Sequence, residues 1–180
     1  MRVTKVNVEQ ALSLIRTIPD YPKPGILFQD ITPVLSNPEA FNVVVRALAQ
    51  VDPESSVVAG IEARGFIFAS AIAVAKGCGF VPLRKKGKLP FTTFSKQYGL
   101  EYGIDEIEIH TDAFQPGSKV LLVDDVLATG GTLVAAIELV KLAGGMVTDI
   151  AVLSEITFLG GRARISEHSP DVAIHALISG

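Results

Sequence analysis

The segment "VLLVDDVLATGGTLVAAIELV", residues 120–140, decides the fold of this chain. Apolar residues lead into two adjacent carboxylates, Asp124 and Asp125, and a short glycine-containing loop follows before a helical pattern begins. A buried apolar run, a loop and a helix form the unit from which parallel sheets with helices on both sides are built. The segment therefore predicts a strand over 119–124, a helix over 132–143, and an α/β fold.

The same alternation of strand and helix patterns continues on both sides of this segment. Short apolar runs predict further strands, and longer stretches of helical composition separate them. The expected strands are 55–61, 79–83, 146–153 and 172–178, and the expected helices are 8–17, 39–50 and 65–77. The sequence thus predicts one domain over residues 1–180, with a mainly parallel sheet flanked by helices.

Two regions stand outside the alternation. Residues 18–38 are rich in proline and predict a small irregular N-terminal part, which we call the hood. Residues 84–106 are long, polar and aromatic, with several glycines. Because a long loop in a compact domain is usually functional, this second region predicts a flexible lid over an active site.

The composition excludes several classes of protein. The hydrophobic share of 48% is high, yet the longest apolar run, Phe66–Ala75, is too short to span a bilayer. The N-terminus lacks the apolar core of a signal peptide, so we expect a cytoplasmic protein without membrane contact. A formal net charge of −3 argues against general nucleic-acid binding. A single cysteine, Cys78, excludes an internal disulfide and a multi-cysteine metal site.

The loop Ala128–Thr132 has the features of an anion-binding site. Gly130 and Gly131 permit backbone shapes that turn consecutive N–H groups toward one anion. The following helix adds its positive N-terminal end, and Thr129 and Thr132 add hydroxyl groups. The loop matches neither GxGxxG nor GxxxxGK[ST], so an ordinary glycine turn remains the alternative.

The carboxylates of Asp124 and Asp125 refine the expected ligand. Two carboxylates would repel a bare phosphate, so they should face hydroxyl groups or a hydrated Mg²⁺ ion. The ligand should therefore carry a phosphate and, nearby, a diol or a metal. A sugar phosphate has this chemistry.

A second strand–helix junction suggests a further anion site. The apolar run from residue 57 ends at Glu62, and Arg64 opens the next helix beside a glycine. The basic cluster Arg84–Lys88 follows the next expected strand and could add positive charge. Each feature alone is also compatible with an ordinary solvated surface. Together they favour a ligand that is anionic at both ends.

Several motifs together resemble the adenine-using branch of the type I phosphoribosyltransferases. The resemblance covers about residues 18–164, through "PDYPKPGILFQDITPVL", "ARGFIF", "RKKGKLP", "LEYG" and "VLLVDDVLATGGT". It implies a Mg²⁺-dependent glycosyltransferase of purine salvage. Such an enzyme transfers ribose 5-phosphate from 5-phosphoribosyl 1-pyrophosphate to N9 of adenine, releasing AMP and pyrophosphate. It also implies a homodimer.

The resemblance assigns the residues that would bind the phosphoribosyl substrate. The 5′-phosphate cradle would comprise Ala128, Thr129, Gly130, Gly131 and Thr132. Asp124 and Asp125 would face the ribose hydroxyls. Pyrophosphate would be held by Arg64, Lys85 and Lys88, with Arg84 reaching toward the partner's site. Substrate and water would hold Mg²⁺, so direct protein ligands to the metal are not expected.

The resemblance also assigns the base-binding and catalytic residues. Phe28 would stack on adenine, the backbone of Leu27 and Gln29 would read its edge, and Leu159 would close the other side. The lid would carry the catalytic residues Glu101 and Tyr102. Since N9 must lose a proton and "VLATGGT" contains no acid or base, Glu101 is the candidate to accept it.

Two alternatives remain at this point. The first is a phosphoribosyltransferase for xanthine or hypoxanthine; enzymes for 6-oxopurines commonly have an acidic residue where this chain has Ala128. The second is a non-enzymatic regulator that senses phosphoribosyl pyrophosphate while binding DNA. Such a regulator needs a DNA-binding segment or a basic face, and this acidic chain offers neither. A smaller departure is Gln29, where the family often has arginine.

Overall fold

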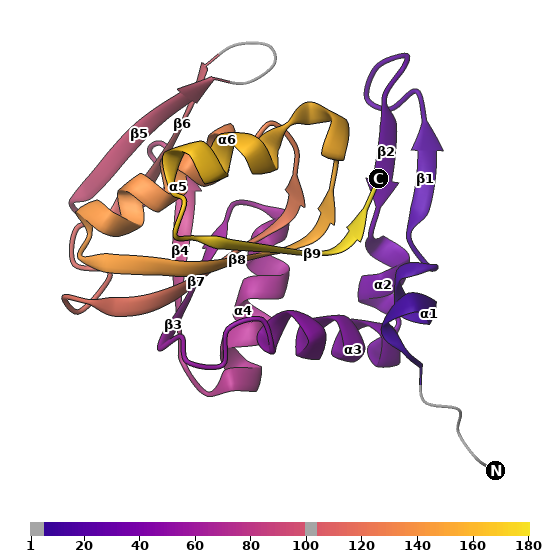
Figure 1. Ribbon diagram of the computed structural model, residues 1–180, viewed down its shortest axis with the longest axis horizontal. Coiled ribbons are helices and arrows are strands. Elements are labelled where there is room, and N and C mark those ends of the chain that lie inside the picture. Colours follow the sequence, from indigo (N-terminus) through magenta and orange to yellow (C-terminus); the bar gives the residue numbers. More distant parts are fainter. Residues whose placement is uncertain (1–5, 100–103) are drawn as a thin grey trace. The chain divides into compact units, whose positions relative to one another are not determined.

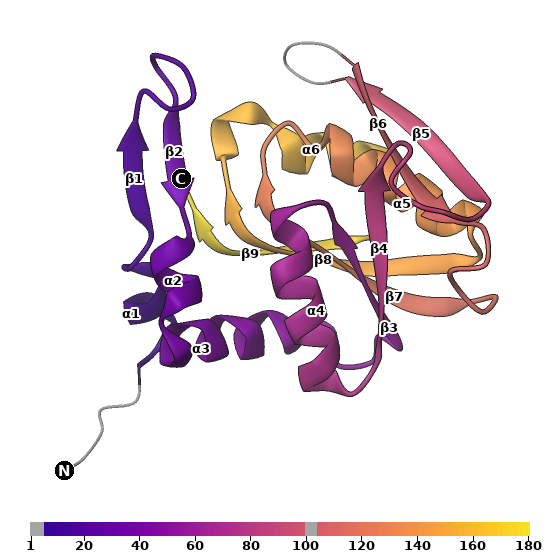
Figure 2. The ribbon, with the colours of Figure 1, turned by 180° about the vertical axis from the view of Figure 1, so that it is seen from behind.

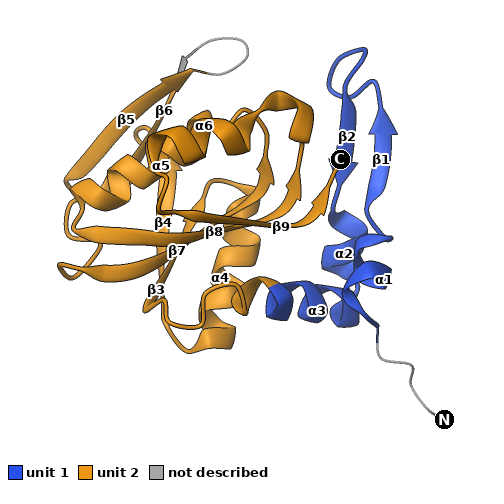
Figure 3. Cartoon of the chain, in the orientation of Figure 1, with its two compact units in different colours: residues 1–47 blue, residues 48–180 orange. Residues whose placement is uncertain are grey.

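The computed structural model describes residues 6–99 and 104–180, which fall into two compact units, Met1–Ala47 and Leu48–Gly180 (Figure 3). The first unit contains α1 (Val8–Leu12), β1 (Arg16–Pro19), β2 (Leu27–Asp30), α2 (Thr32–Ser36) and most of α3 (Pro38–Ala49). The second unit contains the large sheet and the remaining helices.

The first unit is more regular than its proline-rich sequence predicted. β1 and β2 form an antiparallel hairpin within the region expected to be irregular. The helix expected over 8–17 ends at Leu12, because Arg16 already pairs with Asp30 in the hairpin. A capping box of Asn7 and Gln10 fixes the start of α1.

The second unit is built on a seven-stranded sheet with the order β5-β6-β4-β3-β7-β8-β9 (Figure 1). Its strands are β3 (Val57–Ile61), β4 (Gly79–Lys85), β5 (Thr93–Gly99), β6 (Ile104–His110), β7 (Ser118–Leu127), β8 (Gly145–Glu155) and β9 (Ala173–Ser179). The strands β4, β3, β7, β8 and β9 run parallel to one another. β5 and β6 form an antiparallel hairpin, and β6 pairs antiparallel with β4. The predicted mainly parallel sheet is confirmed.

Helices cover both faces of this sheet. α4 (Arg64–Lys76) lies on one face, and α5 (Gly131–Leu142) and α6 (Gly161–His168) lie on the other (Figures 1 and 2). The central strand β7 is accordingly buried on both sides from Val120 to Val123. α4 ends where Gly77 adopts a left-handed conformation, as its sequence predicted. Within the described residues, helices that are both long and apolar enough to cross a membrane are absent.

The β5–β6 hairpin occupies much of the region expected to form the lid loop. Its alternation places Ile107 and Ile109 in the core and leaves Glu106 and Glu108 on the other face. β6 continues the sheet by pairing with β4, and Lys96 of β5 forms an ion pair with Glu138 of α5. Within this region, residues 84–99 and 104–106 therefore consist of strands, a turn and short connecting segments. Glu101 and Tyr102 lie outside the described residues.

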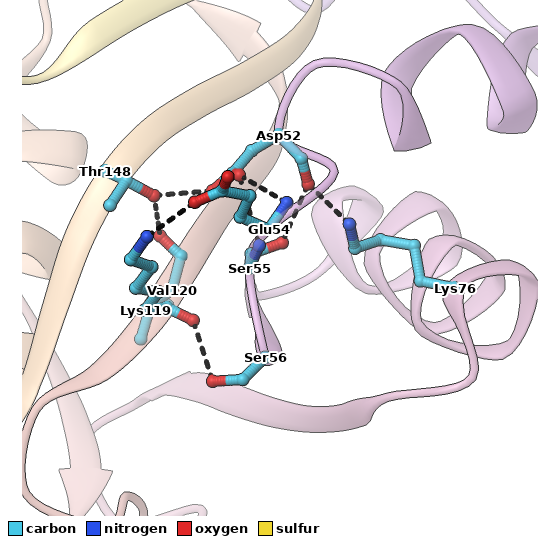
Figure 4. A network of polar contacts seen from close by, with 8 residues as sticks. All are labelled: Asp52, Glu54, Ser55, Ser56, Lys76, Lys119, Val120 and Thr148. Carbon is cyan, nitrogen blue, oxygen red and sulfur yellow. Dashed lines mark hydrogen bonds and ion pairs between the residues drawn. The ribbon is translucent and has the colours of Figure 1, made fainter.

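A polar network fixes the amino ends of the parallel strands (Figure 4). The carboxylate of Asp52 accepts hydrogen bonds from the backbone N–H of Glu54 and from the hydroxyl of Thr148, at 3.0 and 2.6 Å. Lys119 pairs with Glu54, and Lys76 donates to the carbonyl of Asp52. The network joins the segment before β3 to β7, β8 and the end of α4. The opposite edge of the sheet, at the carboxyl ends of the strands, carries the candidate site.

Candidate active site

The candidate site consists of the connections that follow β3, β4, β7 and β8. β3 lies between β4 and β7 in the sheet, and β8 follows β7. Because these strands are parallel, their carboxyl ends meet at one edge, where α/β proteins bind ligands. The anion loop (residues 128–132), the carboxylate pair and the basic turn (residues 84–88) all lie at this edge.

The anion loop leads directly into α5. Gly130 has a φ of 77°, in the left-handed region, and α5 begins at Gly131 with the N–H of Val134 donating to the carbonyl of Gly130. The first N–H groups of a helix have no partner within it and point outward. The permissive conformation that the sequence suggested for both glycines is thus needed at Gly130 alone.

The start of α6 packs against the backbone of the anion loop. A Cβ atom on Gly161 would lie 2.1 Å from the carbonyl oxygen of Ala128, and one on Gly130 would lie 2.7 Å from the carbonyl oxygen of Gly161. Arg162 fixes this turn of α6 by pairing with the buried carboxylate of Glu155. Sequence reasoning missed the role of Gly161, for which the pair "GG" at 160–161 was the available signal.

The β5–β6 hairpin also touches the start of α5. A Cβ atom on Gly131 would lie 3.0 Å from the carbonyl oxygen of Gly99 and 3.3 Å from a guanidinium nitrogen of Arg164. The hydroxyl group of Tyr98 donates a hydrogen bond to Asp105, with 3.2 Å between the oxygens. Burial raises the pKa of this hydroxyl above its ordinary value. The anion loop is therefore supported from two sides, by α6 and by the hairpin.

The carboxylate pair lies at the end of β7. Burial and the neighbouring charge of Asp125 raise the pKa of Asp124 well above the ordinary value of an aspartate. Asp125 forms an ion pair with Arg64, with 2.6 Å between Oδ2 and Nη2. Oδ1 of Asp124 accepts a hydrogen bond from the backbone N–H of Asp125 at 2.8 Å, and this bond offsets the effect of burial only in part.

The junction between β3 and α4 joins the carboxylate pair to the basic turn. Arg64 is the first residue of α4 and contacts Asp125, as described above. A Cβ atom on Gly65 would lie 2.9 Å from Oδ1 of Asp124, so only glycine allows α4 to approach β7 this closely. On the other side, Glu62 accepts hydrogen bonds from the guanidinium group of Arg84 at 3.1 and 3.2 Å.

The basic turn contains four cations, of which three pair with carboxylates. Arg84 pairs with Glu62, Lys85 with Asp105, and Lys86 with Glu106. The hydrogen bonds in these pairs lower the pKa values of Glu62, Asp105 and Glu106. For Lys88, the fourth cation, the described part of the chain contains no ion-pair partner. All three residues predicted to act here, Arg84, Lys85 and Lys88, do lie in this one turn.

The residues present suit a magnesium ion that is held mainly by a substrate. Across residues 6–99 and 104–180, no cluster of three or more His, Cys, Asp or Glu side chains could hold a metal ion. Asp124 and Asp125 nevertheless offer adjacent carboxylate oxygens, and the charge of Asp124 is poorly compensated. Magnesium prefers oxygen ligands and keeps several waters, so two carboxylates beside a substrate's own oxygens fit this ion.

The residues predicted to bind the base belong to two different units. Leu27, Phe28 and Gln29 lie on β2 in the first unit. Phe28 is half-buried and its ring meets that of Tyr21 edge to face, with 5.1 Å between centroids, whereas Leu27 is 66% exposed. Leu159 is half-buried in a single 3₁₀ turn, η1 (Thr157–Leu159), of the second unit. Leu159 is followed by Gly160 and then by Gly161, which packs on the anion loop.

Comparisons with known proteins agree with this architecture. Residues 30–156 match the model of the phosphoribosyl transferase domain family. An adenine phosphoribosyltransferase of Parvibaculum lavamentivorans is 55% identical over 167 residues, covering 92% of this chain and 94% of the relative. The crystal structure of the adenine phosphoribosyltransferase from Thermoanaerobacter pseudethanolicus superposes with a TM-score of 0.89 at 46% identity, covering 97% of this chain and all of that one. The Giardia lamblia enzyme, solved in complex with 9-deazaadenine, has a TM-score of 0.89 at 40% identity, with coverages of 97% and 98%.

Proposed function

The chain belongs to the phosphoribosyltransferase family, among the adenine phosphoribosyltransferases, and from this premise we propose its reaction. It transfers ribose 5-phosphate from 5-phosphoribosyl 1-pyrophosphate to N9 of adenine, giving AMP and pyrophosphate, with Mg²⁺ and in purine salvage. The observation that carries this proposal is the carboxylate pair placed directly before the anion loop and beside Arg64. This arrangement matches a ligand with a phosphate, a diol and a second anionic group.

The anion loop and the carboxylate pair hold the phosphoribosyl group. Backbone N–H groups at the start of α5 bind the 5′-phosphate, supported by the positive end of the helix. The ribose hydroxyls donate hydrogen bonds to Asp124 and Asp125. These donors supply the compensation that burial denies Asp124 in the free protein. The backbone geometry of the anion loop thus selects the phosphate group, and the two carboxylates select the diol.

The cations stabilise the leaving group. Breaking the bond from ribose C1 to pyrophosphate leaves positive charge on the sugar and negative charge on pyrophosphate. Arg64 and the basic turn, with Lys85 and Lys88, stabilise the negative charge as it develops. Bound Mg²⁺ would supply further stabilisation of the pyrophosphate oxygens, held at Asp124 and Asp125 by way of the ribose hydroxyls and water.

The base is held by β2 of the first unit. Phe28 stacks on adenine, and the backbone of Leu27 and Gln29 reads its edge. Because stacking is lost on the base side alone, Phe28→Ala should raise KM for adenine far more than KM for phosphoribosyl pyrophosphate. Steady-state kinetics with each substrate varied in turn measures both. Equal increases in the two constants would instead assign Phe28 to the core.

Glu101 accepts the proton that adenine loses at N9, with Tyr102 beside it in the sequence. The anion loop has alanine at position 128 and offers no base, and Asp124 and Asp125 face the ribose. Glu101→Gln should slow the chemical step by about 10²–10⁴-fold while leaving phosphoribosyl pyrophosphate binding unchanged. Single-turnover kinetics is the appropriate measurement, because slow product release can hide the loss in steady state. A rate within about threefold of the parent would remove Glu101 from the mechanism.

Substrate selection tests the proposed function directly. Adenine, hypoxanthine, guanine and xanthine should each be offered with phosphoribosyl pyrophosphate, with and without Mg²⁺. We expect AMP formation from adenine with Mg²⁺ and no comparable product from the 6-oxopurines, for which Ala128 provides no acid. Preference for hypoxanthine or xanthine would favour the alternative transferase. Binding of phosphoribosyl pyrophosphate without turnover of any base would favour a regulator.

The active form is a cytoplasmic homodimer. α4 carries exposed apolar side chains, since those of Ile67 and Val74 are 37% and 83% exposed. A second copy of the chain would cover such residues, in keeping with the family. Sedimentation equilibrium should give twice the mass of the 19.1 kDa chain. A monomer at micromolar concentration would contradict the assignment.

A further inference from the structure

The four cations of the basic turn do not have equal freedom to bind an anion. Arg84, Lys85 and Lys86 each have a carboxylate partner within 3.1 Å. An incoming anion must compete with that carboxylate at each of these positions. Among the described residues, Lys88 alone in the turn has a side chain without such a competitor. Lys88 is therefore the cation whose placement matters most to an anionic ligand.

The backbone of Lys88 is held from both sides. One carboxylate oxygen of Glu108 accepts hydrogen bonds from the N–H groups of Lys88 and Leu89, at 3.0 and 2.9 Å. The guanidinium group of Arg84 donates to the carbonyl of Lys88 at 3.1 Å. The turn before it bends at Gly87, which has a φ of 78°. The backbone of Lys88 is thus fixed, while among the described residues its side chain forms no ion pair and only adds to the positive charge near Glu62.

Glu108 is an unusual residue to find in this position. Its side chain is 5% exposed, and a buried carboxylate is costly unless it receives several hydrogen bonds. Two backbone donors and, more weakly at 3.4 Å, the hydroxyl of Thr93 supply them. Although four cationic side chains are close in the chain, none of them forms an ion pair with Glu108 in the described structure. The carboxylate of Glu108 is thus directed to the backbone of the turn and not to the side chain of Lys88.

We propose that Glu108 is a positioning residue that presets Lys88 for the pyrophosphate group. The proposal rests on the proposed function and adds to it a residue outside the basic turn. In the absence of ligand, the buried acceptor fixes the loop of Lys88, so little ordering remains to be done when pyrophosphate binds. Arg84 serves the same end by joining the carbonyl of Lys88 to Glu62 at the end of β3.

Three variants test the proposal by calorimetry with pyrophosphate, and separately with AMP. Glu108→Leu keeps the volume but removes the acceptor, so pyrophosphate affinity should fall about tenfold. AMP affinity should stay within about twofold, because AMP uses the anion loop. Glu108→Gln retains an acceptor oxygen, with its amide able to face Thr93, and should restore most of the affinity. Glu106→Leu is the matched control on the same face of β6, and it should change neither affinity by more than about twofold.

A double-mutant cycle with Lys88→Ala separates positioning from general support of the fold. If Glu108 acts through Lys88, adding Glu108→Leu to Lys88→Ala should weaken pyrophosphate binding by less than about twofold further. Hydrogen exchange of the unaltered protein gives a test that needs no variant. The amides of Lys88 and Leu89 should be protected before any ligand is added, and pyrophosphate should change their protection little.

Several results would overturn the inference. The first is an equal loss of AMP and pyrophosphate affinity in Glu108→Leu, and the second is a pyrophosphate affinity in Glu108→Gln as low as that in Glu108→Leu. The third is a roughly tenfold loss of pyrophosphate affinity when Glu108→Leu is added to Lys88→Ala. The fourth is rapid hydrogen exchange at the amides of Lys88 and Leu89 in the free protein. If the unaltered protein binds neither pyrophosphate nor phosphoribosyl pyrophosphate, the proposed function itself fails. If the unaltered protein binds both and the variants behave as just described, the inference alone is lost.

Discussion

The loop after β7 and the turn after β4 lie at the same edge of the sheet but treat charge in opposite ways. At the end of β7, burial and Asp125 raise the pKa of Asp124. Around the turn after β4, ion-pair hydrogen bonds lower the pKa values of Glu62, Asp105 and Glu106. The first region keeps an uncompensated carboxylate in a rigid backbone frame. The second has already neutralised most of its charges.

This difference indicates at which of the two regions a ligand gains most free energy on binding. A hydroxyl donor that reaches Asp124 relieves an existing penalty, whereas an anion that reaches Lys85 must displace Asp105. The β7 loop therefore recognises its ligand by the shape of its backbone and by the desolvated carboxylate of Asp124. The β4 turn contributes a few available charges, chiefly Lys88. Four substitutions and one control test this contrast, and we describe them from the largest expected effect to the smallest.

Gly161→Ala should break the rigid frame of the β7 loop. Its Cβ atom would lie 2.1 Å from the carbonyl oxygen of Ala128, a distance that forces the anion loop to move. Overpacking of this kind costs about 1–3 kcal/mol, so AMP affinity should fall by up to about a hundredfold. Pyrophosphate affinity should change little, since the β4 turn is not touched. Isothermal titration calorimetry with both ligands measures the contrast.

Gly160→Ala is the control for this substitution. Gly160 has a φ of 68° and nothing within 4 Å of a Cβ atom, so alanine meets backbone strain but no neighbour. It should cost stability, about 1–2 kcal/mol, and leave AMP affinity within about threefold. If both variants lose AMP affinity equally, the close approach of α6 does not shape the loop.

Asp124→Asn should raise the melting temperature of the free protein at neutral pH. A carboxyl group whose folded pKa is raised binds more protons in the folded state than in the unfolded state. The raised pKa of Asp124 therefore lowers stability as pH rises above 3.8, the ordinary pKa of an aspartate, and this penalty is complete above the raised pKa. The gain from asparagine should be a few degrees at neutral pH and should vanish in acid. Calorimetric scans across pH give the comparison.

Asp105→Asn should have the opposite sign. Lys85 lowers the pKa of Asp105, so this carboxylate stabilises the fold above pH 3.8, and the contribution is lost as pH falls through the lowered value. The variant should melt below the parent at neutral pH. Two substitutions of the same chemistry would then shift the melting temperature in opposite directions. A loss of stability in both would contradict the assigned charge state of Asp124.

Lys86→Ala should have the smallest effect. Lys86 pairs with Glu106 at the surface, and its side chain is 65% exposed. Such pairs contribute little, because water and salt screen them. Pyrophosphate affinity should remain within about twofold of the parent, measured by the same titration. If Lys86→Ala loses as much pyrophosphate affinity as Lys88→Ala, an ion pair with a carboxylate does not prevent a lysine of this turn from binding pyrophosphate.

The sequence predicted the parallel core because periodicity and length suffice to define buried strands and helices. The strand at 118–127 and the helix from Gly131 were correct to within a few residues. The two antiparallel hairpins were missed, because β1 and β5 are short, polar or proline-rich and are stabilised by pairing with a neighbour. Their own composition gives no such signal.

The candidate site was predicted in part. Residues adjacent in sequence to a strand end, such as Asp124, Asp125 and Arg64, could be assigned because parallel strands share an edge. Residues that act through a long-range contact could not. Glu108 follows the basic turn by 20 positions, and only the register of β6 against β4 brings it under Lys88. The role of Gly161 likewise could not be predicted, because it depends on the packing of α6 on the anion loop.

The network around Asp52 has a consequence for protein engineering. It ties β3, β7 and β8 together at their amino ends with side chains that no ligand-binding loop contains. The order of these strands therefore does not depend on the loops at the other edge. A chimaera that takes the anion loop and the basic turn from a relative should therefore keep the same scaffold, so these anion-binding loops can be exchanged without rebuilding the sheet.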